Sequence, residues 1–133
     1  MLVSYSGDNV YADSGEAINE KQIWIFTKNS DGSYTIVNKT EGLALSLDSH
    51  TYEKKTNVCL RAPGSGREQR WYIYKYSTDQ YVLRPLCAPS CVLNIEGTSP
   101  NAGTNIDIWT YTGKGKQIFT FDMVTALDGM TPV

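Results

Sequence analysis

The sequence repeats itself with a period of about 48 residues, which limits the chain to folds built from three copies of one unit. A glutamine followed two residues later by an aromatic residue recurs at Gln22-Ile23-Trp24, Gln69-Arg70-Trp71 and Gln117-Ile118-Phe119. An asparagine followed by a β-branched residue recurs with the same period, at Asn9, Asn57 and Asn105. Two independent markers with one period indicate a true threefold repeat.

Each repeat is predicted to contain four short strands joined by turns. Apolar and polar residues alternate in short segments, and Gly, Pro, Asn and Asp separate these segments. No segment has ten or more residues of the 3.6-residue apolar periodicity that a longer helix needs. We therefore expect an all-β fold, the β-trefoil, as one domain over residues 1–133. The three pseudo-symmetric repeats are predicted at about residues 1–28, 29–75 and 76–122.

The first repeat is short at the N-terminus. Nothing before Met1 corresponds to the opening strands predicted over 34–37 and 81–84. The segment 128–133 (DGMTPV) resembles 31–37 (DGSYTIV), so the tail over 123–133 is one candidate for the missing strand. The alternative is a fragment of a larger protein in which the tail is a linker.

The Gln-x-Trp step at this period, with an apolar–polar–apolar strand ahead of it, resembles the ricin-B-type (QxW) lectins over nearly the whole chain. The resemblance implies a β-trefoil that binds a carbohydrate without catalysis, a galactose-type or related glycan. It also favours a secreted or cell-surface protein, although the chain begins with no signal peptide. The glutamine of each step lies two residues before an aromatic residue, so the two are predicted to share one face of a strand. An amide beside core aromatic residues has to be hydrogen-bonded, so we expect the glutamine to tie a neighbouring loop to the barrel.

Strand alternation places a tryptophan on the polar face of the third repeat. Ile106 and Ile108 share one face of their strand and are predicted to enter the core, which leaves Asp107 and Trp109 pointing outward. Asn94 points outward from the preceding strand for the same reason. If the two strands form a hairpin, the three polar-face side chains converge, and the indole offers a platform for the apolar face of a sugar.

The resemblance also assigns sugar-binding positions. Matched to the family pattern, these are Asn94, Trp109, Lys116 and Gln117, with Asp107 as a further contact. Asn94 stands where the family usually has Asp, and Lys116 where it usually has Asn, so the identity of the sugar stays open.

The other two repeats are predicted to keep their cores but to have lost their sites. The matching positions of the second repeat have no aromatic residue; they are Ser46, Cys59, Arg61 and Glu68. The first repeat has its aromatic residue out of register; its matching positions are Ser4, Tyr11, Asp13 and Lys21. One shallow site binds weakly, so we expect a homo-oligomer or a larger polypeptide to supply avidity.

Composition excludes several classes of function. A net charge of −2 argues against a nucleic-acid partner, and no apolar run approaches the length of a membrane span. The single histidine and the absence of any catalytic or metal-binding motif predict no enzyme, no cofactor and no metal. The remaining alternative is a degenerate trefoil that binds protein, as a protease inhibitor or an interdomain module, through loops 48–56 and 61–68.

Two smaller features of the sequence are its cysteines and a pair of adjacent lysines. Cys87 and Cys91 either form a disulfide in an oxidising compartment or stay free, with Cys59 left over. The pair Lys54-Lys55 is interpreted as solvated loop charge.

Overall fold

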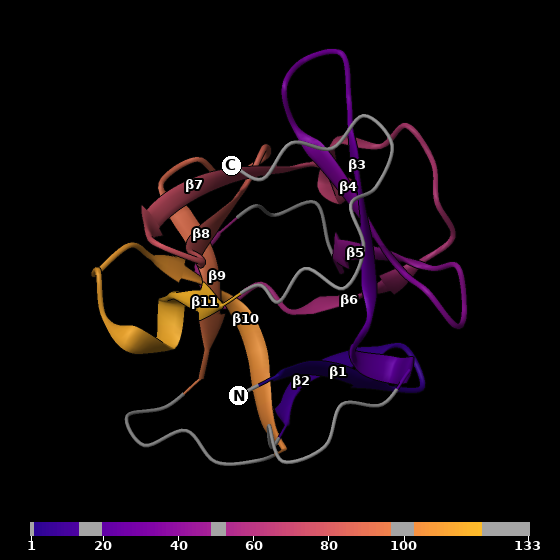
Figure 1. Ribbon diagram of the computed structural model, residues 1–133, viewed down its shortest axis with the longest axis horizontal. Coiled ribbons are helices and arrows are strands. Elements are labelled where there is room, and N and C mark those ends of the chain that lie inside the picture. The colour runs from indigo at the N-terminus through magenta and orange to yellow at the C-terminus, as the bar shows by residue number, and fades with distance from the viewer. Residues whose placement is uncertain (1, 14–19, 49–52, 97–102, 121–133) are drawn as a thin grey trace.

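The computed structural model of the chain describes residues 2–13, 20–48, 53–96 and 103–120 (Figure 1). The tail over 123–133, proposed above as a missing strand, lies outside these residues. The described part consists of short strands and single-turn 3₁₀ helices: β1 (Leu2–Ser6), β2 (Asn9–Asp13), η1 (Glu20–Gln22), β3 (Trp24–Lys28), β4 (Tyr34–Asn38), β5 (Ala44–Leu47), β6 (Val58–Arg61), η2 (Arg67–Gln69), β7 (Trp71–Ser77), β8 (Gln80–Pro85), β9 (Cys91–Ile95), β10 (Thr104–Thr110), η3 (Gly115–Gln117) and β11 (Phe119–Thr120).

The strands form one curled antiparallel sheet, which confirms the all-β prediction. Three hairpins, β1–β2, β5–β6 and β9–β10, occupy equivalent places in the three repeats. Two further antiparallel pairs, β3–β4 and β7–β8, join the end of one repeat to the start of the next (Figure 1). The fold is a β-trefoil, and the exact limits of the repeats stay predictions.

The three hairpins meet around a pseudo-threefold axis. Each contributes one asparagine, and we name Asn9, Asn57 and Asn105 the asparagine ring. Each Nδ2 donates to the Oδ1 of the next member, at 2.9 Å from Asn9 to Asn105, 2.8 Å from Asn57 to Asn9 and 2.7 Å from Asn105 to Asn57. Each ring member also pairs with a residue of a neighbouring hairpin. The asparagines that repeat every 48 residues in the sequence therefore lie where the three hairpins meet.

Apolar residues two apart on these strands fill the core. Trp71, Val58, Ile106 and Ile108 are fully buried, and leucines from β5 and β9 pack against them. Of the aromatic residues in the Gln-x-aromatic steps, Trp71 and Phe119 belong to this core, and Trp24 packs against it half-buried. The indole Nε1 of Trp71 donates to the Leu45 carbonyl at 3.0 Å, which satisfies its one polar group.

The glutamines of the repeat take a different place from the one predicted. Gln69 and Gln117 end the 3₁₀ turns η2 and η3, so they do not share a strand face with the aromatic residue that follows. Their predicted role is confirmed. Gln69 accepts from the Gly64 N–H at 2.9 Å and donates to the Ala62 carbonyl at 2.9 Å, which ties that loop to the barrel.

None of the three cysteines forms a disulfide, so the bond between Cys87 and Cys91 is not made in the structure. Cys91 is buried in the core and Cys87 packs against it, as small apolar side chains do. Among the described residues, no helix is long and apolar enough to cross a membrane.

Candidate functional site

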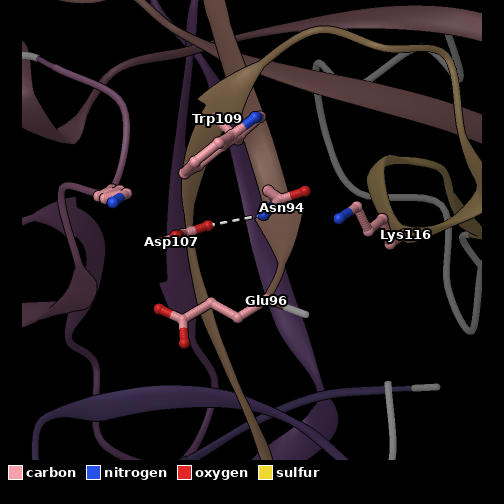
Figure 2. A pocket seen from close by; sticks show the side chains of 6 residues that line it. Asn94, Glu96, Asp107, Trp109 and Lys116 are labelled. Carbon is pink, nitrogen blue, oxygen red and sulfur yellow. Dashed lines mark hydrogen bonds between the residues drawn. The ribbon is translucent and has the colours of Figure 1, made fainter. Parts of the chain in front are cut away.

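The candidate site lies on the hairpin formed by β9 and β10. Their register sets Asn94 opposite Asp107, as strand alternation predicts, while Ile106 and Ile108 point into the core. Asn94 Nδ2 donates to Asp107 Oδ1 at 2.8 Å. Trp109 follows two residues after Asp107 on the same face and lies above this hydrogen bond (Figure 2).

These side chains line a pocket of about 340 Å³. Its lining residues are Lys55, Asn94, Glu96, Asp107, Trp109 and Lys116. The pocket therefore brings together four of the five residues singled out from the sequence. The expectation that Asn94 and Asp107 face solvent is wrong, since they are only 2% and 3% exposed. They form the floor of the pocket, because both line it while almost all of their surface is buried.

Gln117 does not reach the pocket rim and is fully buried. Its Oε1 accepts from the backbone N–H and the hydroxyl of Thr112, at 2.7 and 3.0 Å. Its Nε2 donates to the Thr110 carbonyl at 3.0 Å and to Asn94 Oδ1 at 3.3 Å. Gln117 is thus a positioning residue, which holds the loop after β10 and fixes the amide of Asn94.

Trp109 differs from the other two tryptophans in its polar group. The indole N–H groups of Trp24 and Trp71 both donate to backbone carbonyls, at 3.1 and 3.0 Å. Trp109 is half-buried, and its indole N–H has no hydrogen-bond partner within the part of the chain that the structure describes. A half-covered ring with an available donor at the edge of a polar pocket is suited to contact a ligand.

The floor of the pocket is an unusual place for a carboxylate. Burial raises the pKa of Asp107 to about 6, and the nearby charge of Glu96 adds to the rise. The hydrogen bond from Asn94 and the positive charge of Lys116 act in the opposite direction. Asp107 therefore changes charge in mildly acidic solution, which makes the polarity of the floor dependent on pH.

The residues missed by the sequence analysis are Glu96 and Lys55, which line the pocket, and Lys54, which contacts the Trp109 ring. Glu96 directly follows β9 and lies two residues after Asn94, so extending the two-residue alternation that identified Asn94 was sufficient to find it. Lys54 and Lys55 are exposed, as expected of loop charge, but both ammonium groups lie over the Trp109 ring, at 5.2 and 5.8 Å from its centroid. No local pattern connects residues 54 and 109, because a long-range contact brings them together.

The described residues include no group of three or more His, Cys, Asp or Glu side chains that could hold a metal ion. The pocket instead offers amide, carboxylate, ammonium and indole groups around a flat ring. Such groups are able to exchange hydrogen bonds with a polyhydroxylated molecule, and a flat ring is able to cover one of its apolar faces.

The sequence model of the family described as ricin-type beta-trefoil lectin domain-like matches residues 19–124. The chain belongs to this family. A direct comparison with the sequences of curated proteins finds no match.

Solved structures share the fold of this ricin-type lectin-like domain. The designed threefold-symmetric protein ThreeFoil is 24% identical with a TM-score of 0.76, over 83% of this chain and 77% of that one. An exo-β-1,3-galactanase from Clostridium thermocellum is 18% identical with a TM-score of 0.76, over 83% of this chain but 23% of the enzyme. The Macrolepiota procera ricin B-like lectin, solved in complex with lactose, is 14% identical with a TM-score of 0.70, over 89% and 84% of the two chains. At these identities the likeness shows the fold alone.

The second repeat of the lectin-like domain has no comparable pocket chemistry at the matching positions. Ser46 lies opposite Cys59, and both are buried. The position of Trp109 is taken by Arg61, which is exposed and lies 3.8 Å from a carboxylate oxygen of Asp8. Burial raises the pKa of the Cys59 thiol, which keeps it neutral and unreactive.

Proposed function

We propose that the chain is a carbohydrate-binding lectin domain whose site is the pocket on β9 and β10. Its ligand is a galactose-type or related sugar, bound without catalysis. Asn94 and Asp107 exchange hydrogen bonds with the sugar hydroxyls, and Lys116 closes one side. Trp109 covers an apolar face of the ring, and Gln117 acts through Asn94.

One observation carries the proposal: Trp109 is the tryptophan whose indole N–H is without a partner in the described part of the chain, and it borders the polar pocket. The other two indole N–H groups are satisfied by the protein, as their structural role requires. Leaving a donor unpaired beside amide and carboxylate groups is consistent with a ligand that pairs with it. Membership of a lectin-like family supports the same conclusion.

The arrangement also favours binding over catalysis. The acidic pair Glu96 and Asp107 could be considered for proton transfer, but each accepts a hydrogen bond from an asparagine, Asn105 and Asn94 respectively. Some structural relatives are glycoside-degrading enzymes, and the chain corresponds to a minor part of their length. We propose that any such activity belongs to another domain.

Titration of the protein with sugars while tryptophan emission is recorded tests the proposal. Galactose or lactose is expected to change the emission, and Trp109→Ala is expected to remove the change while leaving the melting temperature nearly the same. Arg61→Ala, at the matching position of the second repeat, is the matched control and is expected to bind as the wild type does. Sugar binding by Trp109→Ala at wild-type affinity contradicts the site, and no response to any sugar on a glycan array contradicts the function.

A further inference from the structure

The turn before β6 has a lysine where the other repeats have glycine. Three residues, each two positions before a member of the asparagine ring, adopt a left-handed backbone: Gly7, Lys55 and Gly103, with φ of 60°, 75° and 88°. Glycine enters this region without cost, whereas a residue with a Cβ does so at the expense of stability. The second repeat therefore retains a side chain at a position where the fold favours none.

This turn is held directly against the candidate site. The Thr56 N–H and hydroxyl both donate to the Glu53 carbonyl, at 3.1 and 2.6 Å, which closes the turn. The Lys55 N–H donates to the Ile108 carbonyl at 2.8 Å, and the Ile108 N–H donates to the Thr56 carbonyl at 3.1 Å. Lys55 and Thr56 are thus held to the strand that carries Trp109, and Lys54 lies next to them in the same turn.

The two ammonium groups have no carboxylate within ion-pair distance in the described ranges. Lys55 lines the pocket, and both lysines rest on the Trp109 ring by a cation–π contact, which is a weak attraction at an exposed position. The carboxylates of the pocket are engaged at the other end, where Asp107 accepts from Asn94. The site therefore has a basic end beside the indole and an acidic end on the floor.

A neutral sugar that stacks on Trp109 displaces ammonium groups from the ring and offers them only neutral hydroxyl acceptors in exchange. A sugar with a negatively charged substituent gives them a charge-assisted hydrogen bond instead. The acidic end still accepts hydrogen bonds from the hydroxyls of the same ring. Charge and position thus discriminate between sugars of similar shape.

We propose that the site selects an acidic saccharide, a pyranose with a carboxylate or sulfate group, which Lys54 and Lys55 bind beside Trp109. This inference rests on the proposed lectin function and specifies its ligand class. Carboxylate and sulfate present the same chemistry to the lysines, so both are included in the test.

The test compares three matched sugars by tryptophan emission or by amide chemical shifts: methyl β-galactopyranoside, methyl β-galacturonide and methyl β-galactopyranoside 6-sulfate. At low salt, at least one charged sugar is expected to bind about five-fold more tightly than the neutral one. The ratio is expected to fall toward one in about 0.5 M salt, where exposed charges are screened. A preference for one charged sugar over the other identifies its acidic group.

Lys55→Gly separates the ligand role from a structural one. The variant restores the residue that the other repeats have, so its melting temperature is expected to stay equal or rise, while the preference for charged sugars falls. Lys54→Ala is expected to act in the same direction, and the double variant to remove the preference. Lys75→Ala, an exposed lysine on β7, is the matched control and is expected to keep the preference.

The outcomes distinguish the two proposals. Equal affinity for the three sugars, or a preference that survives in the double variant, overturns the acidic ligand and leaves the lectin function intact. Binding of none of the three sugars, together with a silent glycan array, overturns both.

Discussion

The β9–β10 and β5–β6 hairpins have the same backbone but different chemistry on their outer faces. In one hairpin Asn94 lies opposite Asp107, and in the other Ser46 lies opposite Cys59 at the same register. Their core faces are alike, with buried aliphatic side chains at the matching positions. The threefold scaffold thus constrains the inward residues of every repeat and leaves the outward ones free to differ.

The difference extends to what the buried glutamines hold. Gln69 and Gln117 both bond two backbone groups of the loop before them, but only Gln117 also donates to a side chain of the pocket, Asn94, at 3.3 Å. One repeat therefore uses the glutamine for folding alone. The third repeat also uses its glutamine, Gln117, to hold a residue of the candidate site.

The largest effect is expected from removing these glutamines. Gln69→Ala and Gln117→Ala leave buried backbone groups unpaired, and each is expected to lower the free energy of unfolding by about 3 kcal/mol. Denaturant unfolding measures this loss. At a temperature where both variants remain folded, only Gln117→Ala is expected to weaken sugar binding. Equal binding by the two variants would show that Gln117 does not position the site.

Trp109 and Arg61 provide the next test, because they occupy matching positions. Trp109→Ala is expected to weaken sugar binding by about 2 kcal/mol, as loss of a central aromatic contact does. Arg61→Ala is expected to change neither binding nor stability by more than about 0.5 kcal/mol. Isothermal titration or chemical-shift mapping compares the two, and similar losses in both variants would contradict a single site in the third repeat.

Asp107 is expected to make stability depend on pH. Its pKa is raised from 3.8 to about 6 in the folded state, so the folded protein holds this proton more tightly than the unfolded chain does. The contribution of Asp107 to stability is then highest below about pH 4, falls as the pH rises from about 4 to 6, and is lower by about 2 kcal/mol above that range. Asp107→Asn is expected to remove this decline, as thermal melts across the range would show.

The control for this prediction lies in a second carboxylate. Hydrogen bonds from Ser33 lower the pKa of Asp31 to about 2, with Arg70 adding to the effect. The stabilising contribution of Asp31 is therefore lost as the pH falls below about 4. This range differs from that of Asp107, and the effect has the opposite direction. A decline between pH 4 and 6 that persists in Asp107→Asn would assign the titration to another group.

A transfer of the pair to the second repeat is expected to have the smallest effect. Ser46→Asn with Cys59→Asp places an amide opposite a carboxylate on the β5–β6 hairpin, at the register that Asn94 and Asp107 have. Because that position is also buried, the double variant is expected to lose about 1 kcal/mol of stability above pH 6, relative to its stability near pH 4. No new pH dependence would mean that the environments of the two hairpins differ by more than these side chains.

Much of the fold could be predicted because the markers are local and repeated. The asparagine at 48-residue spacing marks the contact between successive hairpins. In the second and third repeats the Gln-x-aromatic step marks a 3₁₀ turn that ends in a buried glutamine and the core residue that follows it. Alternation along β10 placed Trp109 on the polar face beside Asp107. It did not reveal how deeply Asp107 is buried, because the covering side chains come from other parts of the chain.

The sequence by itself determined a threefold all-β scaffold, since period and alternation decide which residues must leave water. It also singled out the third repeat, where an aromatic residue and short polar residues share one face. Only the tertiary structure decided that Gln117 acts from within and that Asp107 is nearly inaccessible. It alone also placed two lysines from the turn before β6 over the indole of β10. The lysine contacts join segments about 50 residues apart, and Gln117 bonds a residue of strand β9, so no local pattern encodes these features.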